Sequence, residues 1–345
     1  MGAIDRGRLE AFAYGILPAD NGPVGQRIAR SFEHFRDVSA ERVSAIVKRI
    51  RSDEIAILFD LNGYTQNARP KIFARRPAPL QINSIGFPGT LGADWYDYIH
   101  VDGFVAPPET QSGYAERFFL MPHAYVPSDT RRASVGARPT RSSAGLPDKA
   151  FVFCCFNNTF KVLPDVFAVW MRLLSAVPGG VLWLLGANDD AAINLRREMK
   201  TAGVDPSRLV FAPRVGNAEH LARIALADLF LDTSPYGAHT TTNDALLVGV
   251  PVVTCARDTL ASRNPGSQLR AIGLPDMVTS TFDEYEALAL RLASDPSALA
   301  SVRARLVENR ATYPLFDMAR YARDLEDGLL RIWHDYETST DTASR

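Results

Sequence analysis

The stretch DTSPYGAHTTTNDALLVGVPVV, residues 232–253, places an unusual set of polar groups directly before an apolar helix. The first turn of a helix has unpaired backbone N–H groups and a partial positive charge, so a row of hydroxyls there favours anion binding. We expect Thr240 and Thr241, next to His239, to orient a diphosphate. Asp244 lies one helical turn beyond Thr240, where a carboxylate would repel phosphate but suits a ribose diol. The alternative is an ordinary Thr or Asn N-cap with an aspartate in the first turn.

Two further polar groups follow predicted strands in the same half of the chain. His220 and Arg223 in NAEHLARIA stand three residues apart and share one helix face, where an imidazole could lie against a base and a guanidinium could reach its edge. In CCFNNTFK, a strand runs into Asn157, Asn158 and Lys161, and lysine is a common phosphate ligand. Taken separately, these groups are also typical of a solvated helix face and a surface lysine.

The three groups together describe a site for a nucleoside diphosphate. They supply a histidine with an arginine for a base, an aspartate for a ribose, and threonines with a lysine for phosphates. The sequence contains neither a G-x-G-x-x-G loop after a strand nor a G-x-x-x-x-G-K-[ST] loop, which argues against hydride transfer and ATP hydrolysis. It also lacks a D-x-D motif for a carboxylate-bound metal. We therefore expect a metal-free diphosphate leaving group and no cofactor.

The elements that must position these residues alternate between strands and helices in both halves of the chain. Apolar runs followed by helical periodicity predict two doubly wound α/β domains, in which ligands bind outside the carboxyl ends of the strands. We predict an N-terminal domain over 1–125, a linker over 126–149 that is rich in Pro, Ser, Gly and Arg, a C-terminal domain over 150–336 that ends in a long helix, and a polar tail over 337–345. In the first domain we expect strands over 9–16, 54–61, 78–87, 96–103 and 117–122, and helices over 24–35, 41–50 and 69–76.

The composition excludes several broad classes of protein. The chain has 345 residues, with 38 basic and 39 acidic side chains, so we expect no general binding to nucleic acid. No run approaches the roughly 18 apolar residues that span a bilayer, and the start lacks an apolar signal core, so we expect no membrane association. The three cysteines form no C-x-x-C pair, which predicts buried thiols in a cytoplasmic protein.

Several blocks of the sequence resemble the catalytic region of protein O-GlcNAc transferases. The blocks PAPLQ, GFPGT, FNNTFK, AHTTTND and TLASR are specific in combination, and the likeness runs from about residue 9 to residue 336. The resemblance implies a GT-B architecture of two Rossmann-like domains. It also implies that UDP-GlcNAc is held mainly by the C-terminal domain, and that GlcNAc is transferred with inversion and without a metal to Ser or Thr hydroxyls of proteins.

The resemblance also implies roles for individual residues. Lys161 matches the lysine that stabilises the departing diphosphate, and Asn158 stands where the family has glutamine. The remaining matches are His220 and Arg223 for uracil, His239, Thr240 and Thr241 for the diphosphate and sugar, Asp244 for the ribose, and Gly86 and Pro88 of GFPGT for a loop that faces the sugar and acceptor. Lys161 and His239 are therefore the predicted catalytic residues.

The chain also departs from the family pattern. Phe160 replaces a tyrosine, and Val215 and Asn217 replace an alanine and a lysine, so we expect weaker affinity for UDP. The family has an earlier strand, a His-Pro loop and a tetratricopeptide array before the segment that matches residues 9–16, and we therefore expect an incomplete acceptor-side domain. Two alternatives stay open, namely a truncated or degenerate nucleotide-sugar-binding module without transfer activity, and a transferase with a non-protein acceptor.

Overall fold

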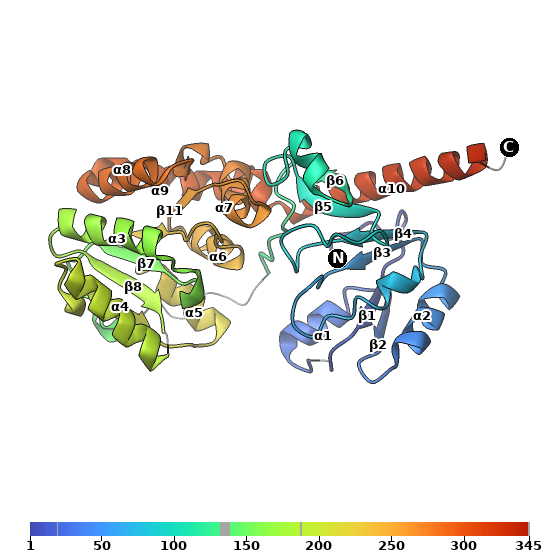
Figure 1. The fold of residues 1–345 in the computed structure, drawn as a ribbon, viewed down its shortest axis with the longest axis horizontal. Coiled ribbons are helices and arrows are strands. Elements are labelled where there is room, and N and C mark those ends of the chain that lie inside the picture. Colours follow the sequence, from blue (N-terminus) through green and yellow to red (C-terminus); the bar gives the residue numbers. More distant parts are fainter. Residues whose placement is uncertain (19, 132–138, 187, 344–345) are drawn as a thin grey trace. The chain divides into compact units, whose positions relative to one another are not determined.

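The chain forms two compact α/β units, which we describe separately on the basis of a computed structural model (Figure 1). The structure describes residues 1–18, 20–131, 139–186 and 188–343. Unit 1 consists of Met1–Pro127 and Asp317–Arg345, and unit 2 consists of Ser128–Phe316. Within the described residues, no helix is long and apolar enough to cross a membrane.

Unit 1 contains a parallel four-stranded sheet and a separate parallel pair of strands. The sheet has the order β3-β4-β5-β6, and the separate pair is β1-β2. The strands are β1 (Phe12–Gly15), β2 (His34–Asp37), β3 (Ile57–Asp60), β4 (Leu80–Asn83), β5 (Tyr98–Asp102) and β6 (Arg117–Met121). The helices are α1 (Pro23–Ala29), α2 (Val43–Ser52) and α10 (Met318–Ala343), with the 3₁₀ turns η1 (Phe73–Arg75) and η2 (Pro108–Gly113).

In unit 1, the helix predicted over 41–50 is confirmed as α2, and the helix predicted over 24–35 is only partly correct. Ile46, Val47 and Ile50 recur at helical spacing on α2, and all three are buried in the core of the unit. The predicted helix over 24–35 instead ends at Ala29, and its last residues enter β2, where they pair with β1. Pairing with a distant strand has overridden the local helical pattern there.

Helix α10 packs on unit 1, although the sequence-based division places residues 317–336 in the C-terminal domain. The helix contacts β6, and a Cβ atom at Gly328 would lie 2.7 Å from the Phe119 ring, so glycine allows this close approach. The buried Glu326 carboxylate accepts hydrogen bonds from the Asp5 backbone N–H and the Arg8 guanidinium, both at 2.8 Å. These contacts join the two ends of the chain within one unit.

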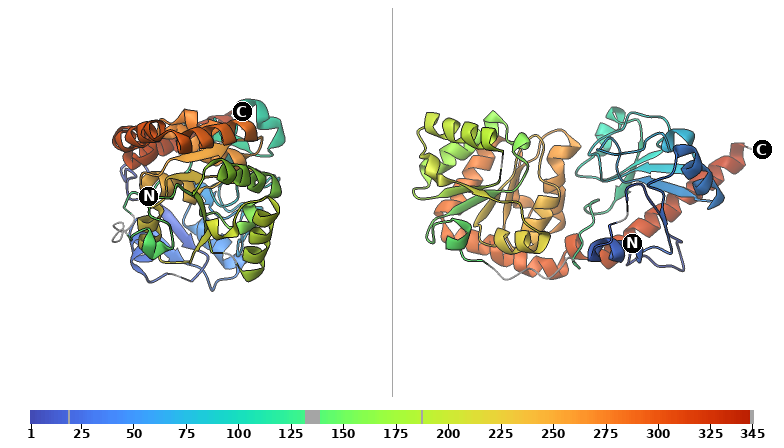
Figure 2. Two further views of the ribbon diagram at one scale, coloured as in Figure 1. Left: turned by 90° about the vertical axis from the view of Figure 1, so that its left-hand side faces the viewer. Right: turned by 90° about the horizontal axis from the view of Figure 1, so that it is seen from below.

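Unit 2 is a parallel six-stranded sheet in the order β12-β11-β10-β7-β8-β9. Strands β7, β10 and β11 are buried at every position, as expected where helices cover both faces of a sheet (Figure 2). The strands are β7 (Val152–Cys155), β8 (Val181–Leu185), β9 (Leu209–Ala212), β10 (Leu229–Leu231), β11 (Val252–Cys255) and β12 (Val278–Thr279). The helices are α3 (Pro164–Ala176), α4 (Asp189–Thr201), α5 (Asn217–Ile224), α6 (Thr240–Leu247), α7 (Leu260–Ala271), α8 (Phe282–Ser294) and α9 (Pro296–Thr312).

The predicted burial of the three cysteine thiols is confirmed in this unit. Cys154 and Cys155 on β7 and Cys255 on β11 are all buried free thiols. They pack as small apolar side chains in the core of the sheet.

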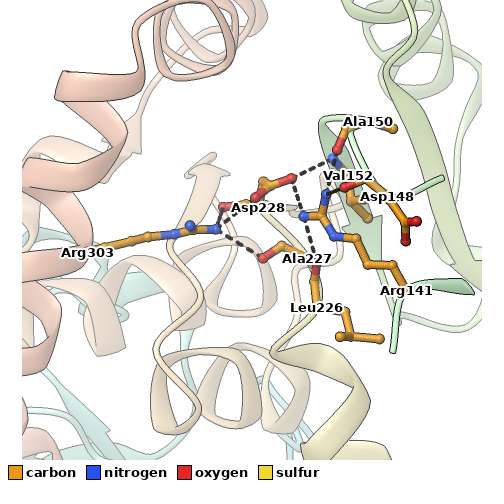
Figure 3. A network of polar contacts seen from close by, with 8 residues as sticks. All are labelled: Arg141, Asp148, Ala150, Val152, Leu226, Ala227, Asp228 and Arg303. Atoms are coloured by element: carbon orange, nitrogen blue, oxygen red, sulfur yellow. Dashed lines mark hydrogen bonds and ion pairs between the residues drawn. The ribbon is translucent and has the colours of Figure 1, made fainter. Parts of the chain in front are cut away.

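A polar network at the amino end of β10 ties distant segments of unit 2 together (Figure 3). The Asp228 carboxylate accepts hydrogen bonds from Arg141 at 2.8 Å, from the Val152 N–H at 2.8 Å and from Arg303 at 3.1 Å. A cavity of about 240 Å³ lies against this network, at the opposite end of the strands from the predicted site. Because both guanidinium groups already bind Asp228, we assign this cavity no ligand.

The predicted linker over 126–149 lies partly outside the described residues, which omit 132–138. Within its described part, Ser142–Ala144 forms the 3₁₀ turn η3. Arg141 donates hydrogen bonds to the backbone oxygens of Ala150 and Leu226 as well as to Asp228. This end of the predicted linker is therefore an ordered part of unit 2.

The close approach of α10 to β6 predicts that Gly328→Val destabilises unit 1. Overpacking against the buried Phe119 ring should lower the free energy of unfolding by about 1–3 kcal/mol. Urea denaturation of the two proteins measures this difference. Gly113→Val is the matched control, because a Cβ atom at Gly113 meets nothing within 4 Å. An equal effect of both substitutions would contradict the proposed packing.

Candidate functional site

Three loops of unit 2 carry the predicted donor-site residues to the carboxyl edge of the sheet. Each loop follows a strand, so all three open at the same edge. Asn158 and Lys161 follow β7, His220 and Arg223 lie on α5 after β9, and His239, Thr240, Thr241 and Asp244 lie at the start of α6 after β10.

Lys161 reaches across to the loop after β10. Its ammonium group donates a hydrogen bond to the Gly237 carbonyl oxygen at 3.0 Å and lies 3.9 Å from the centre of the Tyr236 ring. Burial lowers the pKa of Lys161, while the nearby Asp232 carboxylate opposes this shift. The lysine is therefore partly withdrawn from water and is held by a neutral carbonyl and an aromatic face.

Asn157 joins the loop after β7 to the start of α6. Its side-chain oxygen accepts a hydrogen bond from the Thr241 hydroxyl at 2.6 Å, and its amide group donates to the Thr233 hydroxyl at 2.7 Å. The neighbouring Asn158 is exposed and accepts a hydrogen bond from Arg214 at 3.0 Å. Asn157 therefore connects two loops of the unit, whereas the predicted site residue Asn158 is exposed to solvent.

Asp232 is a central residue of the site that sequence reasoning missed. Its carboxylate accepts hydrogen bonds from the backbone N–H groups of Thr233 at 2.8 Å and Ala238 at 2.7 Å, from the Thr254 hydroxyl at 2.7 Å and from the Asn157 amide at 3.2 Å. Complete burial raises the pKa of Asp232 to about 6. Its position at the end of the apolar strand DLFLD is the sequence feature that could have indicated it.

His220 and Arg223 lie together, as their spacing predicts. The Arg223 guanidinium donates to Nδ1 of His220 at 3.0 Å, so the proton of the neutral imidazole resides on Nε2. Burial and the adjacent guanidinium lower the pKa of His220 to about 4. Phe156 contacts His220 edge-on with ring centres 5.2 Å apart and also packs against Arg223, which connects this helix to the loop after β7.

His239 stands at the beginning of α6, where no side chain caps the helix. The alternative of an ordinary Thr or Asn N-cap is therefore wrong. Nε2 of His239 donates to the Ala261 carbonyl oxygen at 3.3 Å, and burial lowers the pKa of the imidazole to about 4. The ring also stacks on Tyr236, with centres 5.5 Å apart. His239 is thus a neutral, oriented imidazole at neutral pH.

The polar residues of α6 differ in how far they reach solvent. Thr240 is exposed, Thr241 is half-buried and Asp244 is only 3% exposed. Thr242 is buried and donates its hydroxyl proton to the Ala238 carbonyl oxygen at 3.1 Å. An anion at this helix start would therefore meet Thr240 and Thr241, whereas a ribose role for Asp244 depends on the small exposed part of its side chain.

Gly86 and Pro88 lie in unit 1, in the loop that follows β4. A Cβ atom at Gly86 would lie 2.3 Å from the Leu61 carbonyl oxygen, so only glycine fits there. Both residues are half-buried. They lie at the carboxyl edge of the sheet of unit 1, the edge at which open parallel sheets bind ligands.

In the described parts of the chain, no group of three or more His, Cys, Asp or Glu side chains is arranged to hold a metal ion. Near the start of α6, the Lys161 ammonium group and the buried Asp232 carboxylate interact electrostatically.

Comparison with solved structures identifies the class of the fold. A Thermobaculum terrenum O-GlcNAc transferase variant superposes with a TM-score of 0.91 and 30% identity, covering 98% of this chain and 64% of that chain. The Anabaena protein HepE, solved with UDP and glucose, has a TM-score of 0.60 at 12% identity, covering 93% of this chain and 99% of that chain, which shows a shared fold alone. The two α/β units are those of a GT-B glycosyltransferase fold.

Sequence comparison then identifies the family. The model of glycosyl transferase family 41 matches residues 1–135 and 129–325, and the chain belongs to this family. A probable UDP-N-acetylglucosamine–peptide N-acetylglucosaminyltransferase, SEC, of Arabidopsis thaliana is 38% identical over 96% of this chain. A UDP-N-acetylglucosamine–peptide N-acetylglucosaminyltransferase of Caenorhabditis elegans is 29% identical over 98% of it. The chain spans only 35% and 39% of the lengths of these two relatives.

The raised pKa of Asp232 predicts an unusual pH dependence of stability. The folded-state pKa of about 6 exceeds the ordinary value of 3.8, so the stabilisation from protonated Asp232 is complete below pH 3.8 and is lost as the pH rises through about 6. Asp232→Asn resembles the protonated acid. Relative to wild type, the variant should therefore gain on the order of 1–3 kcal/mol in the free energy of unfolding between about pH 4 and pH 7.

Urea denaturation of Asp232→Asn and wild type at about pH 4, pH 5 and pH 7 measures this relative gain. Asp205→Asn is the control between about pH 5 and pH 7, because the pKa of the exposed Asp205 is lowered and its carboxylate stays ionised in that range. The difference in the free energy of unfolding between Asp205→Asn and wild type should therefore be the same at about pH 5 and pH 7. A difference between Asp232→Asn and wild type that is independent of pH would contradict the assigned ionisation.

Proposed function

We propose that this chain is the catalytic region of an inverting, metal-independent glycosyltransferase that binds UDP-GlcNAc and transfers GlcNAc to Ser or Thr hydroxyls of proteins. The observation that carries the proposal is the convergence of the loops after β7, β9 and β10 at one edge of the sheet of unit 2. The two relatives named above, both peptide N-acetylglucosaminyltransferases by name, support the choice of donor and acceptor.

The proposed donor site divides the nucleotide among three elements. The uracil would lie against His220, with Arg223 at its edge, and the ribose would approach Asp244. The diphosphate would lie at the start of α6, where backbone N–H groups and the Thr240 hydroxyl can donate hydrogen bonds. The Thr241 hydroxyl already donates to Asn157, so it would have to leave that partner to bind the diphosphate. The presence of groups suited to a base, a ribose and phosphates at one edge of the sheet supports a nucleoside diphosphate more than an isolated phosphate.

Lys161 would supply positive charge near the diphosphate of the proposed site. The pKa values of His220 and His239 are both about 4, so neither imidazole carries a charge at neutral pH. The helix start offers only about 0.3–1 kcal/mol at an exposed end, or about 2 when partly buried. Lysine is therefore the group best suited to offset the charge that develops on the diphosphate as the bond to the sugar breaks.

The proposed reaction is a single displacement at the sugar. The acceptor hydroxyl oxygen forms a bond to the anomeric carbon while the bond from that carbon to the β-phosphate oxygen breaks. UDP leaves with the bonding electrons, and the acceptor proton passes to a base. We propose that the Gly86 and Pro88 loop of unit 1 contributes to the sugar and acceptor side, and that the protein acts in the cytoplasm.

Removal of the Lys161 ammonium group tests the proposed chemistry. In Lys161→Ala, the loss of transition-state charge stabilisation should lower kcat by at least about 100-fold. The rate is measured as transfer from radiolabelled UDP-GlcNAc to a Ser/Thr peptide library, and UDP affinity is measured by calorimetry. Lys149→Ala is the matched control, because Lys149 is an exposed lysine that precedes β7 in the same unit.

Three results would separate the alternatives. If wild type binds no UDP and Lys161→Ala is indistinguishable from it, the donor-site proposal fails. If wild type binds UDP but releases no sugar to peptide or water, the chain is a nucleotide-sugar-binding module. Transfer to a lipid or small molecule in place of peptide would identify a non-protein acceptor.

A further inference from the structure

Unit 1 contains a buried carboxylate that neither the family blocks nor the proposed donor site includes. Glu116 stands directly before β6, and its side chain is completely buried. The carboxylate accepts a hydrogen bond from the Leu91 backbone N–H at 2.8 Å, a short one from the Thr90 hydroxyl and a longer one from the Asn83 amide at 3.4 Å. Among the described residues, no basic side chain forms an ion pair with it.

The groups that Glu116 holds belong to the loop of Gly86 and Pro88 or to the strand before it. Asn83 ends β4 and donates a second hydrogen bond to the Gly89 carbonyl oxygen at 2.9 Å. Thr90 also accepts hydrogen bonds from the N–H groups of Gly92 at 3.0 Å and Ala115 at 3.3 Å. The far end of the loop is therefore fixed through two side chains that both contact Glu116.

The near end of the same loop has a strained backbone. Ile85 has φ = 60°, a conformation that a β-branched residue rarely adopts. The following Gly86 packs so closely against the loop after β3 that a Cβ atom would lie 2.7 Å from the Asn62 Cα atom. Strain of this kind persists only where surrounding contacts over-determine the backbone, and Glu116 supplies such contacts at the other end of the loop.

We infer that Glu116 is a positioning residue, which acts through Thr90, Leu91 and Asn83 to hold the loop of residues 85–92 in the shape that the acceptor-side step requires. This inference rests on the proposed function. A carboxylate suits the position because it can accept all three hydrogen bonds, whereas a glutamine amide must direct N–H groups toward at least one donor. Burial of a carboxylate without an ion-pair partner is unfavourable, and the three hydrogen bonds that Glu116 accepts offset this cost.

The inference is tested with Glu116→Gln and Thr90→Val, two substitutions that nearly conserve volume. Each should raise the KM for the best acceptor peptide from a Ser/Thr library, or lower kcat, such that kcat/KM falls at least tenfold. The Kd for UDP should stay within twofold of wild type, since the donor residues lie in unit 2. Thr90→Ser keeps the hydroxyl and should restore most of the lost kcat/KM.

Glu109→Gln is the matched control, because Glu109 is an exposed glutamate in the same unit. Activities are compared at a temperature where thermal unfolding shows every variant to be folded. If folded Glu116→Gln and Thr90→Val proteins keep wild-type kcat and acceptor KM, the inference is wrong. The same holds if Thr90→Ser loses as much kcat/KM as Thr90→Val.

Amide hydrogen exchange gives a readout that does not depend on transfer. In Glu116→Gln, exchange should accelerate at least tenfold in a peptide that contains Leu91 and stay unchanged in peptides from unit 2. Unchanged exchange near Leu91 would overturn the inference even if wild type is active. A different outcome is a wild type that transfers no sugar and a Glu116→Gln variant that still exchanges faster near Leu91. That pair of results would contradict the proposed function and support the role of Glu116 in holding the loop.

Discussion

A carboxylate that is withdrawn from water needs hydrogen-bond donors, and Asp232 obtains them from distant segments of unit 2. Asn157 donates from the loop after β7, Ala238 from the approach to α6, and Thr254 from β11. Asn157 then accepts the Thr241 hydroxyl, so one buried group fixes both the helix start and its neighbouring loop. The polar surface at this edge of the sheet therefore depends on a residue that has almost no surface of its own.

Unit 1 uses the same arrangement at the ends of two strands. Asp60 ends β3 and accepts hydrogen bonds from the backbone N–H groups of Asn62 and Gly63 and from the Tyr96 hydroxyl. Asp102 ends β5 and accepts backbone hydrogen bonds from the segment that follows it and from Tyr125. A parallel sheet leaves its loops without ladder partners, and a buried aspartate at the strand end supplies acceptors for the first N–H groups of the loop. Such aspartates shape loops and need not contact a ligand.

Local patterns could predict most of the fold and could place the candidate site residues at one edge of the sheet, but they missed Asp232 and could not predict how the candidate site is held together. The i, i+3 spacing of His220 and Arg223 places them in contact because one helix carries both. By contrast, Asp232 and Asn157 are 75 residues apart, and only the adjacent positions of β7 and β10 in the sheet bring them together. Long-range packing likewise explains why β2 replaces the end of a predicted helix and why α10 packs on the first unit.

Burial also decides how charge is distributed at the proposed donor site. It keeps His220 and His239 neutral and leaves Lys161 as a cation beside the loop before α6, where its ammonium group binds the Gly237 carbonyl oxygen and the Tyr236 ring. A diphosphate would have to compete for that ammonium group with the loop that frames the site. Lys161 can leave the Gly237 carbonyl oxygen for a diphosphate because the loop after β10 does not depend on it. Asp232 holds that loop by accepting a hydrogen bond from the Ala238 N–H. A buried acceptor, Asp232, thus fixes the backbone after β10, and a partly buried cation from the loop after β7, Lys161, can change partners and so remains available to a ligand.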